Sequence, residues 1–407
     1  MEDFRTYKLG DIVNVLDYKR IPLSSTQRQN KKGIYPYYGA QGIIDYINDY
    51  IFDGEYLLIA EDGENLKSQK QHIAQIAKGK YWVNNHAHIV ESNGLCDIRY
   101  VYYLLNKMDL SGYITGSAQP KLNQTNLLKI ELQLPSLKEQ YKIAEFLHLF
   151  DDKIELNRRI NENLEQQAQA LFKSWFVDFE PFKNGKFVDS ELGMIPEELN
   201  IRYIGDIPHT IECGRRPKGG ATNKGVPSIG AENIKGLGYY DYSKTKYIPK
   251  EFALTTNRGK INGYELLIYK DGGKPGYFIP NYTIFGDGFP FDEMFINEHV
   301  FKLDLLNKEY NIFAYFYMQT PFIMNQLNSI GGKAAIPGIN TKDVESLPIF
   351  NGDNKKIQEF GNHVLPMITT ILRNCNENAR LAQLRDTLLP HLMSGELKIS
   401  NTDSKNL

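Results

Sequence analysis

Hydrophobic and polar residues follow two patterns along this chain, and each pattern occurs twice. In residues 1–136 and again in 198–350, short runs of aromatic and β-branched residues are broken by glycine and asparagine, as in strands joined by tight turns. In 137–180 and 351–394, apolar residues recur every three or four positions, which is the seam spacing of a coiled coil. The order of these patterns predicts two mixed globules, each followed by a long amphipathic helix.

The two helical stretches are copies of one another at a fixed offset. Pro120 aligns with Pro337, which sets an offset of 217 residues (337 − 120). At this offset, apolar positions of the first helix fall on apolar positions of the second: Leu147, Phe150, Ile154, Leu164 and Leu171 fall on Val364, Met367, Ile371, Leu381 and Leu388. A register kept through a loop, a strand and a helix of roughly ten turns indicates two copies of one module.

Two asparagines interrupt each apolar seam at matched places. Asn157 falls on Asn374, and Asn161 falls on Asn378. A polar group in such a seam is satisfied only by the correct partner, so matched pairs favour a role in helix register over the alternative of tolerated exposed positions. Antiparallel packing about a pseudo-two-fold axis would bring Asn157 and Asn161 near Asn378 and Asn374, and we expect that arrangement.

These patterns predict an α/β chain in which two mixed α+β globules are joined by two long antiparallel coiled-coil helices, related by a pseudo-two-fold internal repeat. Helix-breaking residues set the boundaries, because Pro181 stops the first helix and Gly395 stops the second. The expected segments are a first globule at 1–136, a central helix at 137–180, a linker at 181–197, a second globule at 198–350, a distal helix at 351–394 and a tail at 395–407.

Composition and charge narrow the class of protein. Hydrophobic residues make up 42% and charged residues 24%, which is ordinary for globular domains with real cores. The net charge of −2 gives no global attraction to nucleic acid, so a binding face would need local segregation of charge. Three widely separated cysteines exclude a disulfide framework. The start lacks a secretory signal, and no apolar run approaches the ~18 residues of a membrane span, so we expect a soluble cytoplasmic protein.

Motifs of catalysis and metal binding are missing from the sequence. Gly331-Gly332-Lys333-Ala334 has neither the spacing nor the hydroxyl of a phosphate-binding loop, and no Asn/Asp-Pro-Pro-Tyr/Phe cluster of an adenine methyltransferase occurs. Asp386, Glu396 and Lys398 lie across a helix end, which favours a solvated terminus over a nuclease site. His86 and His88 alternate on one strand face, which favours a structural or DNA-facing pair over a metal site. We therefore expect no catalytic residue, metal or cofactor in this chain.

Three stretches carry a family resemblance. They are residues 134–140 (Leu-Pro-Ser-Leu-Lys-Glu-Gln), residues 171–182 at the end of the first helix, and residues 388–397 at the end of the second. Together with the globule–helix–globule–helix order, they make the chain resemble the DNA-specificity subunit of type I restriction-modification systems over essentially its full length. The resemblance implies two target-recognition domains, each of which reads one half of a split double-stranded DNA site.

The resemblance also implies the partners. The two helices would act as a spacer and as the dock for two methyltransferase subunits, and restriction subunits would join the complex. Those partners would use S-adenosylmethionine, ATP and magnesium, while this chain would bind none of them. Because the globules are the variable part of the family, base-contacting residues do not transfer from it.

Candidate DNA contacts therefore come from residue chemistry. Arginine can read guanine, glutamine can read adenine and lysine neutralises phosphates. In the first globule these types crowd between residues 19 and 38, although a solvated loop beside a strand is the alternative. The candidates there are Arg20, Gln27, Arg28, Lys31, Tyr37 and Tyr38.

Further candidates lie in glycine-rich loops. Gln119 and Lys121 belong to a loop led by Gly116, which aligns with the loop that contains Lys333; a plain turn is the alternative in both. In the second globule, the segment Cys213-Gly214-Arg215-Arg216-Pro217-Lys218 packs three cations beside glycines, and a second loop carries two lysines. The candidates there are Arg215, Arg216, Lys218, Lys270 and Lys274.

Two other functions are compatible with these patterns. One keeps the fold and places the chain in a methylation-only or type II-like system. The other is a coiled-coil adaptor whose globules bind proteins or glycans. Salt-dependent DNA binding, which follows from counterion release, would separate the adaptor from the DNA-recognition subunit.

Overall fold

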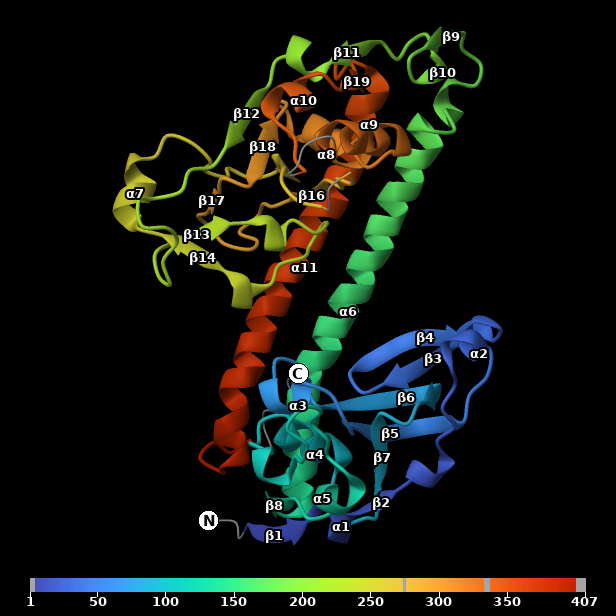
Figure 1. Cartoon of the computed structure of the whole chain (residues 1–407), viewed down its shortest axis with the longest axis vertical. Helices are drawn as coiled ribbons and strands as arrows, with labels where there is room; N and C mark the ends of the chain where they lie inside the picture. Colours follow the sequence, from blue (N-terminus) through green and yellow to red (C-terminus); the bar gives the residue numbers. More distant parts are fainter. Residues whose placement is uncertain (1–3, 274–275, 333–336, 400–407) are drawn as a thin grey trace. The chain divides into compact units, whose positions relative to one another are not determined.

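A computed structural model describes residues 4–273, 276–332 and 337–399 (Figure 1). The chain forms two compact units. The first unit combines Met1–Asp152 with Ala382–Leu407, and the second unit is Lys153–Leu381. Each unit therefore contains one globule together with a segment of both long helices.

The first globule is built on a mixed sheet with the strand order β2-β7-β5-β6-β3-β4, in which only β3 and β6 run parallel. A second, two-stranded antiparallel sheet pairs β1 with β8. The strands are β1 (Arg5–Lys8), β2 (Val13–Val15), β3 (Lys32–Gly39), β4 (Gly42–Ile47), β5 (Phe52–Ala60), β6 (Ala74–Val83), β7 (Ala87–Ser92) and β8 (Glu131–Leu134). The helices are α1 (Leu9–Ile12), η1 (Asp17–Lys19), α2 (Ser25–Gln29), α3 (Asn65–Ser68), α4 (Ile98–Leu105), η2 (Ser111–Tyr113) and α5 (Gln124–Leu127).

The second globule has two main sheets. The antiparallel sheet β12-β18-β15-β16 lies beside the sheet β14-β13-β17, in which β13 and β17 run parallel, and the pairs β9–β10 and β11–β19 are separate. The strands are β9 (Phe187–Ser190), β10 (Gly193–Pro196), β11 (Ile201–Tyr203), β12 (Thr210–Cys213), β13 (Val226–Ile229), β14 (Lys246–Ile248), β15 (Leu266–Tyr269), β16 (Asn281–Ile284), β17 (Phe295–Ile296), β18 (Val300–Asp304) and β19 (Pro348–Phe350). The helices are η3 (Glu180–Phe182), η4 (Ile204–Asp206), η5 (Ala231–Asn233), η6 (Tyr242–Lys244), α7 (Lys250–Thr255), α8 (Lys308–Tyr317), α9 (Pro321–Gly331) and α10 (Thr341–Glu345).

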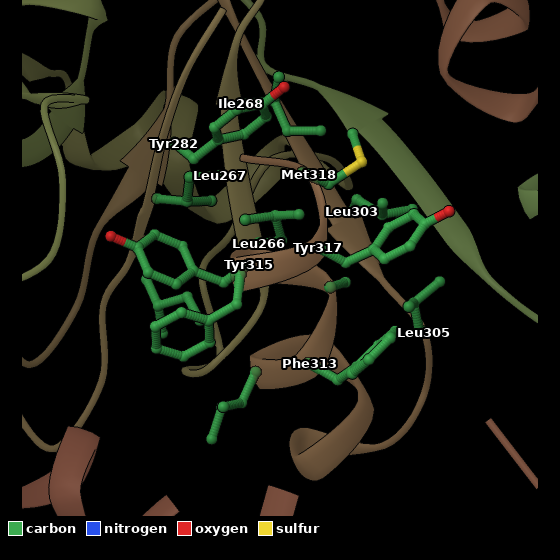
Figure 2. Close-up of a cluster of buried hydrophobic side chains, with 14 of the residues drawn as sticks. Leu266, Leu267, Ile268, Tyr282, Leu303, Leu305, Phe313, Tyr315, Tyr317 and Met318 are labelled. Atoms are coloured by element: carbon green, nitrogen blue, oxygen red, sulfur yellow. The ribbon is translucent and has the colours of Figure 1, made fainter. Parts of the chain in front are cut away.

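Each unit buries its own hydrophobic core. In the second unit, the apolar run Leu266–Ile268 of β15 packs against α8, whose aromatic side chains Phe313, Tyr315 and Tyr317 are buried (Figure 2). In the first unit, Leu57 and Ile59 of β5 belong to a core that also contains Leu147, Leu389 and Leu392. The long helices therefore contribute to both cores.

The two long helices, α6 (Leu137–Phe176) and α11 (Lys355–Met393), begin and end at identifiable signals. The Ser136 hydroxyl accepts a hydrogen bond from the Glu139 amide at 3.4 Å, and the Asn354 side chain accepts one from the Lys356 amide at 2.8 Å, so both N-termini are capped. After α6, Phe179 takes a left-handed φ of 55° just before Pro181. After α11, Gly395 takes a φ of 73°.

The helices pack antiparallel, as the sequence predicts. In the second unit, Asn157 Nδ2 donates to Asn378 Oδ1 at 2.9 Å, and Asn374 Nδ2 donates to Asn161 Oδ1 at 2.8 Å. Residue numbers rise along α6 as they fall along α11, which defines the antiparallel direction. Asn157 is buried and also donates to Glu377 Oε2 at 2.7 Å.

The buried face of α6 differs in part from the predicted seam. Leu171 of that seam is only partly buried, whereas the neighbouring Phe172 and Phe176 are 6% and 5% exposed. Both side chains pack in the aromatic cluster of the second globule. In this part of α6, contact with the globule therefore decides which side chains are buried, and the heptad spacing does not. Among the described residues, no helix is both long and apolar enough to cross a membrane.

Candidate nucleic-acid interface

Arg20 is held by the first globule rather than presented to solvent. Its guanidinium donates to Glu61 Oε2 at 2.8 Å and to the Ala87 carbonyl at 2.9 Å, and it lies 3.2 Å from Asp17 Oδ2. Its side chain is only 16% exposed. This geometry argues against a DNA contact by Arg20, because its hydrogen-bonding capacity is used inside the protein.

Arg28 and Tyr37 are likewise committed to internal contacts. Arg28 bonds the Leu23 carbonyl at 2.7 Å and Asp45 Oδ2 at 3.2 Å, and it stacks 5.2 Å from the centre of the Tyr37 ring. Tyr37 is 1% exposed, and its hydroxyl accepts a hydrogen bond from the Leu23 amide. Burial removes Tyr37 from the candidate DNA contacts, and Arg28 is better described as a support for helix α2.

The other candidates of this stretch are more open. Gln27 is exposed, although its side chain accepts a hydrogen bond from the Ser24 amide at 2.8 Å and so caps α2. Lys31 is partly exposed and lies over the Trp82 ring. Tyr38 is half-buried against Tyr81, and burial raises the pKa of its hydroxyl. Gln27 and Lys31 remain available on this surface.

A partly buried ionic network surrounds Arg20. His88 Nδ1 lies 2.5 Å from Asp17 Oδ2, and His88 Nε2 lies 2.7 Å from the Leu122 carbonyl. Lys121 Nζ lies 3.1 Å from Glu61 Oε1. Burial would raise the pKa of Glu61, but hydrogen bonds from Arg20 and Lys121 outweigh it and lower that pKa.

Potential metal ligands come together within this network. The ligand atoms of Asp17, Glu61 and His88 lie within 4.8 Å of one another, which the sequence did not predict because the carboxylates are distant in the chain. Arg20 and Lys121 already supply the positive charge that these carboxylates require. The donor set therefore fits a structural ionic network better than a metal centre.

The loop that carries Gln119 and Lys121 depends on a glycine. Gly116 has a φ of 84°, and a Cβ there would lie 2.2 Å from the Gln119 carbonyl oxygen. The loop closes through reciprocal backbone hydrogen bonds between Thr115 and Lys121, each 2.8 Å long. Gln119 is exposed, and the Lys121 side chain is 52% exposed. The aligned Lys333 lies outside the described residues.

In the second unit, Arg215, Arg216 and Lys218 are exposed on the loop that follows β12. The two arginines line a hollow of about 300 Å³ together with Lys246, Asn297 and His299. Gly214 fixes the start of this loop, because a Cβ there would lie 1.9 Å from the Ile296 carbonyl oxygen. Arg216 is 67% exposed and has a loose contact of 3.6 Å with Glu298. This basic loop has the accessible donors that DNA recognition requires.

Lys270 differs from these residues because it is mostly covered. Its ammonium lies 3.2 Å from Asp271 Oδ1 and 5.5 Å from the centre of the Phe301 ring, and its side chain is 20% exposed. Lys274 lies outside the described residues. Lys270 is therefore less accessible than the arginines of the basic loop.

Both globules share one feature that was not predicted from the sequence, an aspartate–histidine pair. Asp62 contacts His86, and Asp271 contacts His299, with a carboxylate-to-Nδ1 distance of 2.7 Å in each pair. A signal was present in the sequence, because Asn-x-His occurs as Asn84-Asn85-His86 and again as Asn297-Glu298-His299. The repeat was hard to find because its spacing differs from that of the helices.

Comparisons with known proteins agree with this architecture. The family model described as type I restriction modification DNA specificity domain matches residues 1–166. The MjaIX specificity subunit of a type I restriction enzyme from Methanocaldococcus jannaschii is 29% identical over 76% of this chain and 71% of its own length. The HindI specificity subunit of a type I restriction enzyme from Haemophilus influenzae is 24% identical over 85% of this chain and 84% of its own length.

A solved structure shares the fold. The S subunit of a type I restriction-modification system from M. genitalium superposes with a TM-score of 0.63 at 15% identity, and the match covers 96% of each chain. The helix pair, the internal repeat, the family model and these relatives point to the same family. Residues 1–166 match the model of this family, and over most of its length the chain is similar to the specificity subunits of type I restriction-modification systems.

Proposed function

We propose that this chain reads a bipartite, asymmetric site in double-stranded DNA, with residues 1–136 and 198–350 as its two target-recognition domains. The observation that carries the proposal is the repeat itself: the helices match in register, while the exposed loops of the two globules differ in length and chemistry. Different loops contact different bases, so the two half-sites differ in sequence. The exposed basic loop Arg215–Lys218 is the strongest candidate for reading the second half-site.

The catalysis of the complex belongs to its partners. We propose that two methyltransferase subunits dock on the long helices and that restriction subunits complete the assembly, with S-adenosylmethionine, ATP and magnesium bound by those partners. Exposed apolar side chains on α6, such as Leu156 (51% exposed) and Ile160 (37% exposed), support a docking role for the helix. A subunit that reads cellular DNA would act in the cytoplasm.

Mapping of methylated adenines tests the proposed function. In DNA from cells that express this chain with its methyltransferase, we expect methylation within a split motif whose halves differ and are separated by a fixed gap. Cells that express the methyltransferase alone provide the control and should lack this motif. A contiguous motif, or two identical half-sites, would contradict the two-domain model.

We also propose that the asparagine pairs set the register of the helices. The Asn161→Leu variant leaves the Asn374 amide without its acceptor and is expected to lower the free energy of unfolding by ~1–2 kcal/mol. The double variant Asn161→Leu/Asn374→Leu removes both polar groups and should cost less than the sum of the two single changes.

Urea unfolding of the four proteins in this cycle measures the coupling between Asn161 and Asn374. Asn163→Leu is the matched control, because Asn163 is exposed on the same helix and bonds the exposed Gln167. If the loss of unfolding free energy in the double variant equals the sum of the losses in the two single variants, the asparagines act independently.

A further inference from the structure

The two aspartate–histidine pairs are equally placed and equally open to solvent. Asp62 holds His86 in the first globule, and Asp271 holds His299 in the second, both at 2.7 Å. The two histidine side chains are 50% and 51% exposed. Since a carboxylate oxygen accepts from each Nδ1, the ring orientation is fixed and Nε2 is the ring atom that can meet another partner. His299 Nε2 also lies 3.7 Å from Glu298 Oε1, which is too long for a hydrogen bond and is easily exchanged.

The backbone around the two pairs is also the same. In both globules the residue before the aspartate bonds the histidine carbonyl, the glycine after it bonds a proline carbonyl, and an asparagine caps the histidine amide. In the first globule these bonds are Glu61 N to His86 O (2.9 Å), Gly63 N to Pro120 O (3.2 Å) and His86 N to Asn84 Oδ1 (2.8 Å). In the second they are Lys270 N to His299 O (3.1 Å), Gly272 N to Pro337 O (3.0 Å) and His299 N to Asn297 Oδ1 (2.9 Å).

A lysine accompanies each pair but comes from a different place in the chain. In the first globule, Lys121 contacts Glu61, the neighbour of Asp62, at 3.1 Å. In the second, Gly338 occupies the position of Lys121, and Lys270, at the position of Glu61, contacts Asp271 at 3.2 Å. The cation beside the pair is therefore retained although the residues that supply it are exchanged.

This shared constellation persists in globules whose other exposed side chains have diverged. If the two half-sites differ in base sequence, parts common to both globules can recognise only what the half-sites have in common, which is the sugar–phosphate backbone. We propose that Asp62–His86 with Lys121, and Asp271–His299 with Lys270, each form a DNA phosphate contact. In each, the histidine is in the imidazolium form, so that Nε2–H donates to a phosphate oxygen while Nδ1–H donates to the aspartate, and the lysine ammonium adds a second positive charge nearby. This inference rests on the proposed function.

The test uses the full chain in its complex with the methyltransferase. His86→Gln and His299→Gln should each weaken binding several-fold, and by the same factor, on the cognate duplex, on duplexes altered in one half-site and on unrelated duplexes. The slope of log K against log salt should fall by about one for each contact removed. The methylated motif should stay unchanged, because phosphate contacts carry no base information.

His391→Gln is the matched control. His391 also pairs with a carboxylate, Glu396, at 2.7 Å, and its side chain is 51% exposed, but it lies near the end of α11 outside the shared constellation. This variant should bind DNA like the parent. If a histidine variant lowers the unfolding midpoint, Lys121→Gln replaces it in the test, because this variant leaves the imidazole and Asp62 in place. Lys121→Gln must then also weaken binding by the same factor on every duplex.

Two results would overturn the inference. One is an altered base preference in either half-site, which would make the histidines base-reading residues. The other is unchanged affinity on every duplex. Both differ from a failure of the proposed function itself, in which the parent complex would show no preference for a split site.

Discussion

Replacement of Phe172 by alanine is expected to destabilise the second unit by ~3–5 kcal/mol, the range for deletion of a buried phenylalanine side chain. Phe172 is 6% exposed and lies where α6 meets the globule. Its ring centre is 5.8 Å from that of Phe313 on α8 and 5.8 Å from that of Phe360 on α11. The variant leaves a cavity between α6, α8 and α11. Because these helices pack against one another, the surrounding side chains can fill the cavity only in part.

Hydrogen exchange of the amides of β15 and α8, together with urea unfolding, measures this effect within the second unit. Phe322→Ala on α9 is the matched control, because it removes the same side chain from a position that is 39% exposed. We expect the control to lose far less free energy of unfolding. Equal losses in the two variants would show that Phe172 does not join the helix to the globule.

The long helices were predictable in detail because their signals are local. Apolar spacing, Pro181 and Gly395 gave bounds close to those observed, and the asparagine repeat gave the antiparallel pairing. Phe172 was missed for a physical reason. The seam spacing describes packing between two helices, while this part of α6 packs against both α11 and an aromatic globule core.

The candidates of the first globule show that residue type alone does not predict whether a side chain is free to contact DNA. Arg20 and Tyr37 belong to residue types that contact DNA, but their partners come from elsewhere in the chain: Glu61 and Ala87 bind Arg20, and Leu23 binds Tyr37. Such partners are known only after folding. The loop at Arg215 is exposed, as expected of a DNA-binding loop, and its glycines and three cations lie within one short segment; its contact with DNA stays a prediction.

The aspartate–histidine repeat was hidden by unequal loop lengths. The aspartates are 209 residues apart (271 − 62), and the histidines are 213 apart (299 − 86), whereas the helices keep an offset of 217. A search at one fixed offset therefore finds the helices and misses the pairs. Backbone hydrogen bonds align the two globules independently of insertions. The structure therefore shows the repeated aspartate–histidine pair, which an alignment at one fixed offset does not.

Removal of the arginine side chains of the basic loop should have the largest effect on DNA recognition. If Arg215 or Arg216 bonds a guanine edge with two hydrogen bonds, its replacement by alanine is expected to cost ~1–3 kcal/mol of discrimination at one base pair. Both side chains are exposed, and the loose contact between Arg216 and Glu298 is easily exchanged for a base. The loss should appear only for base changes in the second half-site, because the loop belongs to the second globule.

Competition binding with duplexes altered at one base pair at a time measures this effect, and mapping of methylated adenines checks it in cells. Arg202→Ala is the matched control, since Arg202 is an exposed arginine of the same unit on β11. A uniform loss of affinity on all duplexes would assign Arg215 and Arg216 to phosphates instead of bases. Relaxed recognition of both half-sites would contradict the model in which each globule reads its own half, because the second globule would then influence bases that only the first one contacts.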